Sequence, residues 1–289
     1  MTRFLKTSVN FFAGTWAAKF FKSIPIKSFI YRKFVPKKEE LVVECLGNRM
    51  HVNARDSGIA PDLFFRGIYE PFETKLFLNL ISENMRVMNI GANFGYYVML
   101  AAKKVGVNGK VYAFEPEPKN YQLLLKNIKE NGYGNVVPVQ AAISDKPGVL
   151  KLFLDSDNAG NHSLGGEGKY LQVKADTVDN YLEIFGEKEK IDIIQMDTQG
   201  SEGLILDGAF ETISRSRPKI IMEFWPYGLK NVGTDALGLL KKIESYGFRV
   251  SVIDEKLKSL RCLSPYKIVE ECVRSKNGKG FVNLLLEMV

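Results

Sequence analysis

From Met85 onward, the chain alternates between two hydrophobic patterns. Short runs rich in Val, Ile and Phe alternate with longer segments whose apolar residues recur every three or four positions. The first pattern is typical of buried strands, and the second of helices that cover a sheet. The predicted strands are 87–90, 111–114, 136–139, 191–196, 220–224, 248–253 and 281–286. The predicted helices are 96–104, 119–131, 202–214 and 235–246. This alternation predicts an α/β domain over residues 85–289, with a mostly parallel sheet whose last strand runs antiparallel.

Two further segments depart from this alternation. Residues 41–84 form a leading segment, in which alternating positions at 41–44 and 49–53 flank Gly47-Asn48. This pattern predicts a β-hairpin, and residues 73–80 are expected to form a short helix after it. Residues 149–173 are an insertion, in which 149–154 and 170–173 are predicted to pair around a Gly- and Asn-rich loop at 158–166.

The first 40 residues form a basic, aromatic arm. Leu5, Val9, Phe12, Trp16 and Phe20 share one face of a helical wheel. Residues 1–38 hold nine Lys or Arg and no Asp or Glu, out of 40 basic and 33 acidic residues in the whole chain. The other 251 residues therefore hold 31 basic and 33 acidic side chains and are close to neutral. An amphipathic helix of this kind has three interpretations: peripheral membrane contact, packing on its own domain or on a second subunit of a homodimer, and nucleic-acid binding.

Composition narrows the class of protein further. With 45% hydrophobic and 25% charged residues, the chain is not of the disordered or collagen-like class. Its three Cys and two His lack the close spacing of zinc sites and disulfide frameworks, so we expect free thiols and no metal. No run of 18 apolar residues is present. These features predict a cytoplasmic protein, with the arm as its means of peripheral attachment to a membrane.

The clearest motif is a glycine turn after the first predicted strand. In residues 87–97, Gly91 and Gly95 follow the strand and open a helix. Glycines there let a ligand approach the backbone, and the helix N-terminus favours a carboxylate or phosphate. Glu115 ends the next strand, where an acidic side chain can bind both hydroxyls of a ribose. Glu117, two residues on, is expected in solvent.

Two cofactors compete for this turn, a nicotinamide dinucleotide and S-adenosylmethionine. The turn has the form Gly-x-x-x-Gly and lacks the middle glycine that a pyrophosphate needs. A ligand that carries an amino-acid carboxylate therefore fits better.

A series of motifs in fixed order resembles the FkbM family of S-adenosylmethionine-dependent methyltransferases, within the class I methyltransferase fold. The matching segments are Tyr69-Glu70-Pro71, 89–95, Phe114-Glu115-Pro116, 141–145, Asn158-Ala159-Gly160 with Ser163-Leu164, Met196-Asp197 with Gly200 and Glu202, and Arg217-Pro218 leading to Glu223. The resemblance implies a Rossmann-like, seven-stranded, mostly parallel sheet and S-adenosylmethionine as cofactor. It also implies O-methylation of a sugar or natural-product hydroxyl.

The resemblance also assigns the cofactor-binding residues. Those implied to bind the donor are Asn89, Gly91, Ala92, Asn93, Gly95, Glu115, Ala141 and Asp197. Within this set Glu115 would hold the ribose, Ala141 would lie near the adenine, and Asp197 would lie beside the methyl group. Three positions depart from the family pattern: Asn89 replaces the usual Asp of the first strand, and Gln195 and Gln199 replace charged residues around Asp197.

Methyl transfer to a hydroxyl needs a base, and several residues are candidates for it. The predicted catalytic residues are Asp197, Glu223 and His162, and Glu202 is a further candidate base. For three of these an alternative stays open: Asp197 as a positioning residue, His162 as a solvated loop side chain, and Glu202 as a partner of its helix N-terminus. The segment Glu223-Phe224-Trp225-Pro226-Tyr227 could form an aromatic acceptor wall suited to a sugar or planar ring, or simply cap the core.

The end of the fourth strand bears on one class of acceptor, nucleic acid, while the resemblance implies the others. It ends in Met-Asp-Thr-Gln-Gly and not in the Asn/Asp-Pro-Pro-Tyr/Phe segment that resembles amino-directed DNA methyltransferases. Nucleic acid is therefore not expected as substrate. The predicted function is O-methylation of a hydroxyl on a sugar, glycan or secondary metabolite. The alternative is a donor-binding, catalytically weakened partner protein at a membrane.

Overall fold

A computed structural model describes Tyr31 and residues 39–155 and 159–288. Nearly all of the predicted arm, and position 158 of the predicted loop, lie outside the described residues, so the three interpretations of the arm remain predictions. Tyr31 is buried, and its ring packs edge-on against Phe64 at 5.8 Å between ring centroids.

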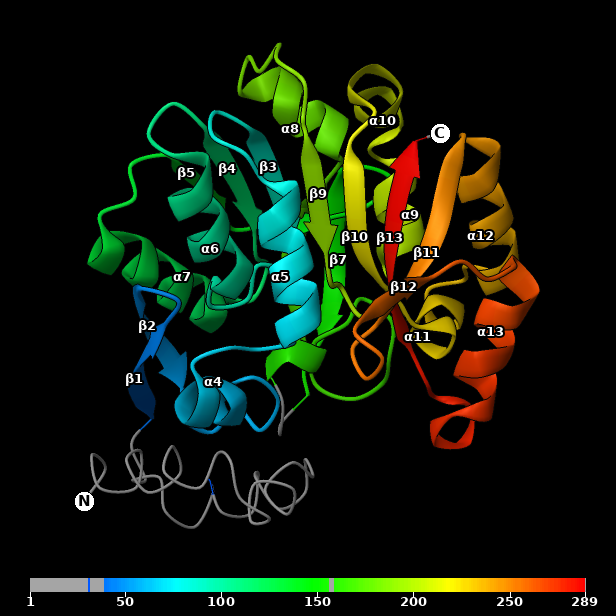
Figure 1. Ribbon diagram of the computed structural model, residues 1–289, viewed down its shortest axis with the longest axis horizontal. Coiled ribbons are helices and arrows are strands. Elements are labelled where there is room, and N and C mark those ends of the chain that lie inside the picture. Colours follow the sequence, from blue (N-terminus) through cyan, green and yellow to red (C-terminus); the bar gives the residue numbers. More distant parts are fainter. Residues whose placement is uncertain (1–30, 32–38, 156–158, 289) are drawn as a thin grey trace.

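A mixed central sheet organises the described part of the chain, and it has the strand order β5-β4-β3-β9-β10-β13-β11-β12 (Figure 1). Its parallel strands are β3 (Arg86–Ile90), β4 (Lys110–Phe114), β5 (Val136–Val139), β9 (Ile193–Met196) and β10 (Lys219–Phe224). β13 (Val282–Met288) is antiparallel to both of its neighbours, β10 and β11 (Phe248–Asp254). The α/β prediction, including the antiparallel last strand, is confirmed.

The predicted seven strands are joined by an eighth in the described residues, the short β12 (Ser259–Arg261). Asp254 accepts hydrogen bonds from the backbone N–H groups of Lys256 and Leu257, which closes a tight turn after β11. The turn brings β12 back antiparallel to β11. Three residues carry too little periodicity to be predicted as a strand.

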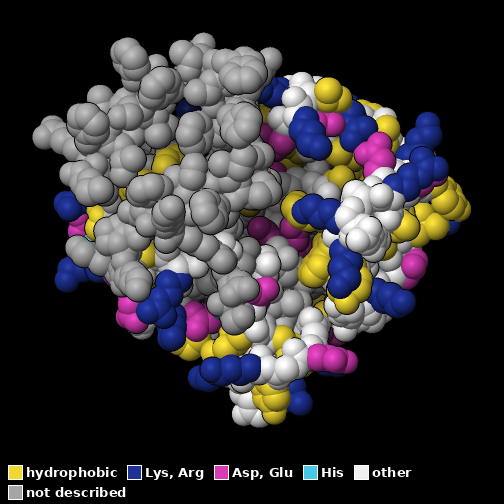
Figure 2. Space-filling view, turned by 90° about the horizontal axis from the view of Figure 1, so that it is seen from below, with side chains coloured by type: hydrophobic (Ala, Val, Ile, Leu, Met, Phe, Trp, Pro, Cys, Tyr) yellow, Lys and Arg dark blue, Asp and Glu magenta, His cyan; other side chains and the backbone are white. Residues whose placement is uncertain are grey.

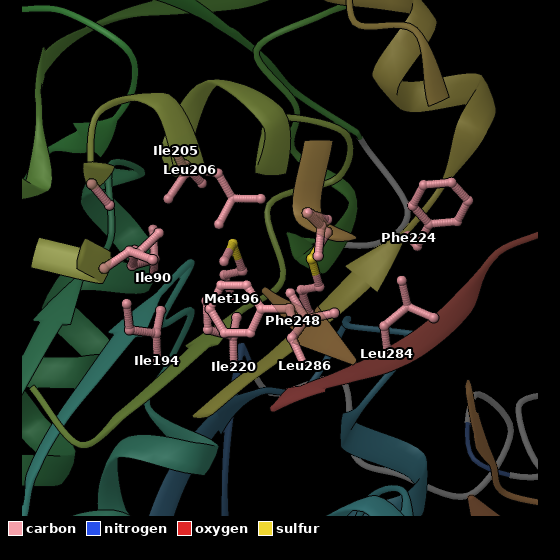
Figure 3. Packing of buried hydrophobic residues seen from close by; sticks show 14 of the residues in the cluster. Ile90, Ile194, Met196, Ile205, Leu206, Ile220, Phe224, Phe248, Leu284 and Leu286 are labelled. Atoms are coloured by element: carbon pink, nitrogen blue, oxygen red, sulfur yellow. The ribbon is translucent and has the colours of Figure 1, made fainter. Parts of the chain in front are cut away.

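Two apolar layers cover the sheet because strand side chains alternate between its faces. On one face Val87, Ala113 and Ile193 pack under the helices α4 (Ala60–Arg66), α5 (Pro71–Leu80), α6 (Tyr96–Val105) and α7 (Pro118–Asn131). Figure 3 shows the other face, where residues such as Ile90, Ile194 and Met196 point toward Ile205 and Leu206. The helices on that side are α8 (Val178–Ile184), α9 (Glu202–Asp207), α10 (Phe210–Ser216), α11 (Pro226–Asn231), α12 (Ala236–Ser245) and α13 (Pro265–Arg274).

The single helix predicted over 202–214 is wrong, since α9 and α10 replace it. The break falls at Gly208, where a Cβ atom would lie 2.1 Å from the backbone oxygen of Ser144. Asp179 then accepts hydrogen bonds from the N–H groups of Glu211 and Thr212, which starts α10 as a separate helix. Both contacts join residues far apart in the sequence, so the local pattern could not show them.

The predicted insertion forms a small sheet of its own. β7 (Gly148–Phe153) pairs antiparallel with β8 (Tyr170–Asp176), as predicted, and β6 (Ala142–Ile143) adds a parallel strand to β8. A short 3-10 turn, η1 (Ala159–Asn161), lies between β7 and β8.

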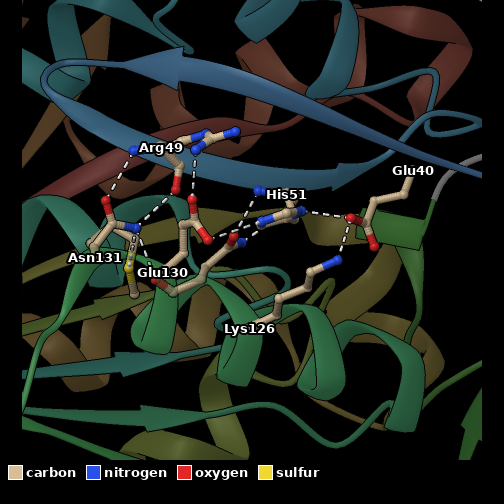
Figure 4. A network of polar contacts seen from close by, with 8 residues as sticks. Glu40, Arg49, His51, Lys126, Glu130 and Asn131 are labelled. Carbon is tan, nitrogen blue, oxygen red and sulfur yellow. Dashed lines mark hydrogen bonds and ion pairs between the residues drawn. The ribbon is translucent and has the colours of Figure 1, made fainter.

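The predicted hairpin is also confirmed, as β1 (Glu40–Cys45) and β2 (Asn48–Asn53), and it docks on α7 through polar contacts (Figure 4). Asn127, fully buried, accepts from the N–H of His51 at 2.6 Å and donates to the His51 carbonyl at 2.9 Å. It also donates to the carbonyl of Phe94 at 2.7 Å. His51 Nδ1 lies 2.5 Å from a Glu40 oxygen, which Lys126 also contacts. Asn127 therefore ties the hairpin to the glycine turn after β3.

Replacing Asn127 by Ala is expected to lower the free energy of unfolding by roughly 2–4 kcal/mol, because it leaves buried backbone groups without partners. Urea denaturation of the full chain measures this loss. Asn131→Ala is the matched control: Asn131 makes the same pair of bonds to the backbone of Arg49, at an exposed position. We expect that control to lose less than about 1 kcal/mol, because water can replace the bonds. Equal losses of unfolding free energy in the two variants would show that burial does not determine the energetic cost of removing these hydrogen bonds.

Candidate active site

A pocket of about 910 Å³, its open mouth included, lies at the carboxyl edge of the parallel strands. The turn after β3 forms one wall. Gly91 (φ +80°) needs its left-handed conformation and its lack of a side chain, since a Cβ there would lie 2.1 Å from the backbone oxygen of Asp197. The turn therefore lies directly on the end of β9. Ala92 and Asn93 line the pocket beside it, and Gly95 (φ +96°) opens α6.

Glu115 lies at the end of β4 and also lines the pocket. Its two carboxylate oxygens accept hydrogen bonds from the N–H groups of Asn93 (2.7 Å) and Glu117 (2.8 Å). Burial raises the pKa of Glu115 to about 7. A carboxylate oxygen accepts more than one hydrogen bond, so Glu115 can also receive ligand hydroxyls.

The expectation that Glu117 lies in solvent is wrong. Glu117 is buried and caps α7 by accepting a hydrogen bond from the N–H of Asn120 at 2.7 Å. Pro118 occupies the first turn of α7, which leaves Glu117 as the N-cap residue. The sequence Glu-Pro-x-Asn carried this signal.

Asn89 lies on β3 with its amide at the pocket. Its Nδ2 donates a hydrogen bond to Gln195 Oε1, from the neighbouring strand β9. Its Oδ1 is buried and has no hydrogen-bond partner among the described residues. Two of the three departures from the family pattern are therefore in contact, as a neutral pair. Ala141 lines the pocket as well.

Asp197 follows β9 and borders the pocket, and beside it lies a group of acidic side chains. Gln199 Nε2 donates to Asp197 Oδ1 at 2.8 Å and to Glu223 Oε2 at 2.9 Å. We call Asp197, Glu223, Glu70 and Glu73 the acidic cluster. Tyr97 and Asn283 each donate hydrogen bonds to both Glu70 and Glu73.

Burial dominates the electrostatics of the acidic cluster. It raises the pKa of Asp197, and it raises the pKa of Glu223 well above its usual range, with Asp197 as the next largest cause. Burial and Glu73 likewise raise the pKa of Glu70 well above its usual range. Within the described ranges no Lys or Arg side chain is a cause of these shifts. The carboxyl groups of the cluster therefore keep their protons to higher pH than exposed carboxyl groups do.

Glu70 and Glu73 are site residues that sequence reasoning missed. They are the two acidic residues of 63–82, a stretch rich in apolar and aromatic residues that also holds Arg66 and Lys75. Buried acidic residues in such a stretch are a recognised sign of a functional site, so a signal was present. Glu70 also has a left-handed backbone (φ 37°), which is unusual for a residue other than glycine and typical of functional sites.

The other two predicted bases take different places. His162 lines the pocket, and its Nδ1 accepts a hydrogen bond from the N–H of Asp155 at 3.1 Å. Burial lowers the pKa of His162. Glu202 is fully buried, and its carboxylate accepts hydrogen bonds from the N–H groups of Thr198 (2.9 Å) and Gly200 (3.1 Å). Glu202 therefore holds the loop between β9 and α9.

With this geometry established, comparison with known proteins identifies the family. The Methyltransferase FkbM domain matches residues 89–250, which include the glycine turn, Glu115, Asp197 and Glu223. The chain belongs to the FkbM family of methyltransferases. The predicted resemblance is thereby confirmed, and with it S-adenosylmethionine as the cofactor of the family.

Relatives with curated functions include two methyltransferases. A protein-L-isoaspartate O-methyltransferase from Methanococcoides burtonii is 39% identical over 59 residues, which are 20% of this chain and 29% of that protein. The methyltransferase sdnD of Sordaria araneosa is 25% identical over 183 residues, covering 52% of this chain and 70% of that protein. The chain thus spans less than a third of the first relative.

Similar solved structures include an FkbM methyltransferase from Methylobacillus flagellatus, with a TM-score of 0.45 and 14% identity over 94% of this chain and 60% of that chain. A putative methyltransferase from Streptococcus mutans in complex with SAH has a TM-score of 0.45 and 11% identity, over 76% of this chain and 97% of that chain.

The residues of the pocket fit S-adenosylmethionine. The bare backbone at Gly91 allows close approach, and the unpartnered Oδ1 of Asn89 can accept from an ammonium group. Among the described residues, no group of three or more His, Cys, Asp or Glu side chains is placed to hold a metal ion. In the same part of the chain, no helix has the length and apolarity needed to cross a membrane.

Proposed function

We propose that the chain transfers a methyl group from S-adenosylmethionine to a hydroxyl of a sugar, glycan or secondary metabolite. The observation that carries the proposal is the position of Asp197, which borders the donor pocket and is joined to Glu223, another member of the acidic cluster, through Gln199. A carboxylate there can take the proton of a hydroxyl next to the methyl group. Carboxylates and amides are also the usual partners of sugar hydroxyls.

The proposed roles in donor binding follow from the pocket. Glu115 would accept both ribose hydroxyls, and the backbone around Gly91, Ala92, Asn93 and Gly95 would surround the methionine part. Asn89 would accept from the ammonium group, and Ala141 would contact the adenine. Bound S-adenosylmethionine supplies an activated methyl group on sulfonium, so orientation of the acceptor and removal of its proton are what the protein must add.

Asp197 is the proposed base. Gln199 occupies its Oδ1, and among the described residues no hydrogen bond to its Oδ2 is found, so that oxygen can receive the acceptor hydroxyl. The raised pKa of Asp197, caused by burial, makes it a stronger base than an exposed Asp. Glu223, whose pKa burial raises further, would keep its proton and donate it to an acceptor oxygen. His162 would border the donor and not act as the base.

Methyl transfer from labelled S-adenosylmethionine across a panel of free sugars, sugar phosphates, glycans and phenolic metabolites tests the proposal. Label transfer to a hydroxyl of any of them supports it. Saturable donor binding without transfer to any of them would favour the second candidate, a donor-binding partner protein of weakened activity. The neutral Asn89–Gln195 pair is the observation that favours this candidate.

Asn89→Asp tests how much this neutral pair weakens the donor site. A carboxylate would give the ammonium group a charge-assisted bond, and Gln195 can turn its amide to donate to it. We expect donor affinity to rise roughly three- to tenfold, because a charged hydrogen bond is stronger than a neutral one. Calorimetric titration measures the change. Unchanged or weaker binding would indicate that Asn89 does not meet the ammonium group.

A further inference from the structure

A basic and aromatic surface lies beside the acidic cluster. We call Tyr227, Phe281, Lys276 and Lys279 the basic rim. All four side chains are exposed. The ammonium group of Lys279 lies 4.6 Å from the centre of the Tyr227 ring, and that of Lys276 lies 4.6 Å from the centre of the Phe281 ring. Two cations and two rings thus form one mixed surface.

Strand register places the basic rim next to the acidic cluster. Glu223 on β10 pairs with Asn283 on β13, and Phe224 pairs with Val282. Phe281 precedes Val282, so it lies two residues from Asn283, which donates to Glu73. Two residues of strand span about 7 Å. Figure 2 shows Asp and Glu side chains deep in a hollow, with Lys, Arg and hydrophobic side chains along one edge.

The backbone of this edge has an unusual conformation. Lys276 (φ 47°) and Asn277 (φ 56°) both adopt the left-handed conformation, before Gly278 (φ 85°). Consecutive residues of this kind are costly and are retained mainly at functional sites. The carbonyl of Lys279 accepts a hydrogen bond from Trp225 Nε1 at 3.2 Å, which anchors the loop to the start of α11. The loop thus holds both lysines against the rings of Phe281 and Tyr227, beside the start of α11.

We infer that the basic rim binds a phosphate ester carried by the methyl acceptor, while the acceptor hydroxyl lies at the acidic cluster. This inference rests on the proposed function and names its substrate class. Two lysines match the charge of a phosphate monoester, which is about −1.5 to −2 near neutral pH. Within the described residues neither lysine forms an ion pair with a carboxylate, so both charges are available. Because Phe281 lies two residues from Asn283, an acceptor held at the acidic cluster can extend toward the basic rim.

Titration of the full chain with inorganic pyrophosphate tests the basic rim without turnover. Binding is followed by the fluorescence of Trp225, which lies beside Lys279. The chain has one other tryptophan, Trp16, and the Trp225→Phe variant shows how much of the fluorescence change comes from Trp225. We expect Lys276→Gln/Lys279→Gln to weaken binding roughly tenfold. Lys104→Gln/Lys188→Gln is the control, since both lysines are exposed. Lys104 lies in the last turn of α6 and Lys188 precedes β9, so both lie at the edge of the sheet opposite the basic rim. It should bind as tightly as the parent. Equal affinity in the rim variant would overturn the inference.

Two further experiments distinguish a phosphorylated acceptor from a lipid headgroup, and distinguish failure of this inference from failure of the proposed function. Vesicles containing phosphatidylglycerol should bind the parent and the rim variant equally. If the rim variant loses vesicle binding while pyrophosphate binding does not depend on the lysines, the rim binds a lipid surface and the inference is overturned. For a phosphorylated acceptor, the rim variant should show a KM raised roughly tenfold at unchanged kcat. Pyrophosphate binding that depends on the lysines, in the absence of any methyl transfer, would support the rim and contradict the proposed function.

Discussion

Replacing Asp197 by Asn is expected to lower kcat for methyl transfer by roughly 10²- to 10⁴-fold, the usual contribution of a general base. The amide has the same shape and can still accept the hydrogen bond from Gln199 at Oδ1, so the loop should keep its structure. The amide cannot take a proton from the acceptor. Single-turnover kinetics with saturating donor and acceptor measure the loss, and calorimetry should show a donor Kd within about threefold of the parent.

The pH profile separates a base from a positioning residue. Because burial raises the pKa of Asp197, its basic form becomes populated only as pH rises through that raised value. The parent rate should therefore rise with pH to a plateau, and the residual rate of the Asp197→Asn variant should lack that limb. Glu223→Gln, the matched control, keeps a neutral side chain that can donate and should retain the limb. A rate in the Asp197→Asn variant close to that of the parent would contradict the assignment.

Replacing Glu115 by Ala is expected to weaken donor binding roughly 100-fold. The change removes a carboxylate that would receive two ribose hydroxyls, each such bond to a charged group contributing about 1.5–3 kcal/mol. It also frees the N–H groups of Asn93 and Glu117, which shape the pocket wall. Calorimetric titration with S-adenosylmethionine measures the ratio of Kd values.

The ionisation of Glu115 adds a second test of the same role. Burial raises its pKa to about 7, and the carboxylate accepts ribose hydroxyls better than the acid does. Donor affinity of the parent should therefore rise as pH increases through about 7, and that of the Ala variant should not. Glu117→Ala serves as control, since Glu117 caps α7 and should chiefly affect stability. If it weakened the donor as much as Glu115→Ala, the ribose role would be wrong.

The sequence predicts the sheet well because its central strands are buried and its longer helices have one apolar face. The hairpin, the five parallel strands and α6, α7 and α12 lie within a few residues of their predicted bounds. The short helices α4, α8, α11 and α13 were not predicted. Three of them, α4, α11 and α13, begin with Pro in their first turn, so a start signal was present. The six or seven residues of α4, α8 and α11 carry little periodicity, whereas α13 has ten residues and its pattern was missed.

The candidate site also has a part that the sequence predicts, the donor pocket, and a part that it does not, the acidic cluster. Residues of the donor pocket are close in sequence to strand ends, so motif spacing brings Gly91, Glu115 and Asp197 together. The acidic cluster is different, since Glu70 meets Asn283 across 213 positions. Only the packing of α5 against the end of the sheet creates that contact. A residue on a helix near the start of the domain and one on its last strand belong to no common sequence motif. The acceptor side of the site could therefore be recognised only from the three-dimensional structure.

The central claim is that this pocket binds S-adenosylmethionine even though Asn89 and Gln195 are neutral. Calorimetric titration of the unmodified full chain with S-adenosylmethionine tests it most directly. The account predicts saturable binding at one site per chain, competed by S-adenosylhomocysteine. Absence of binding at millimolar donor would contradict it.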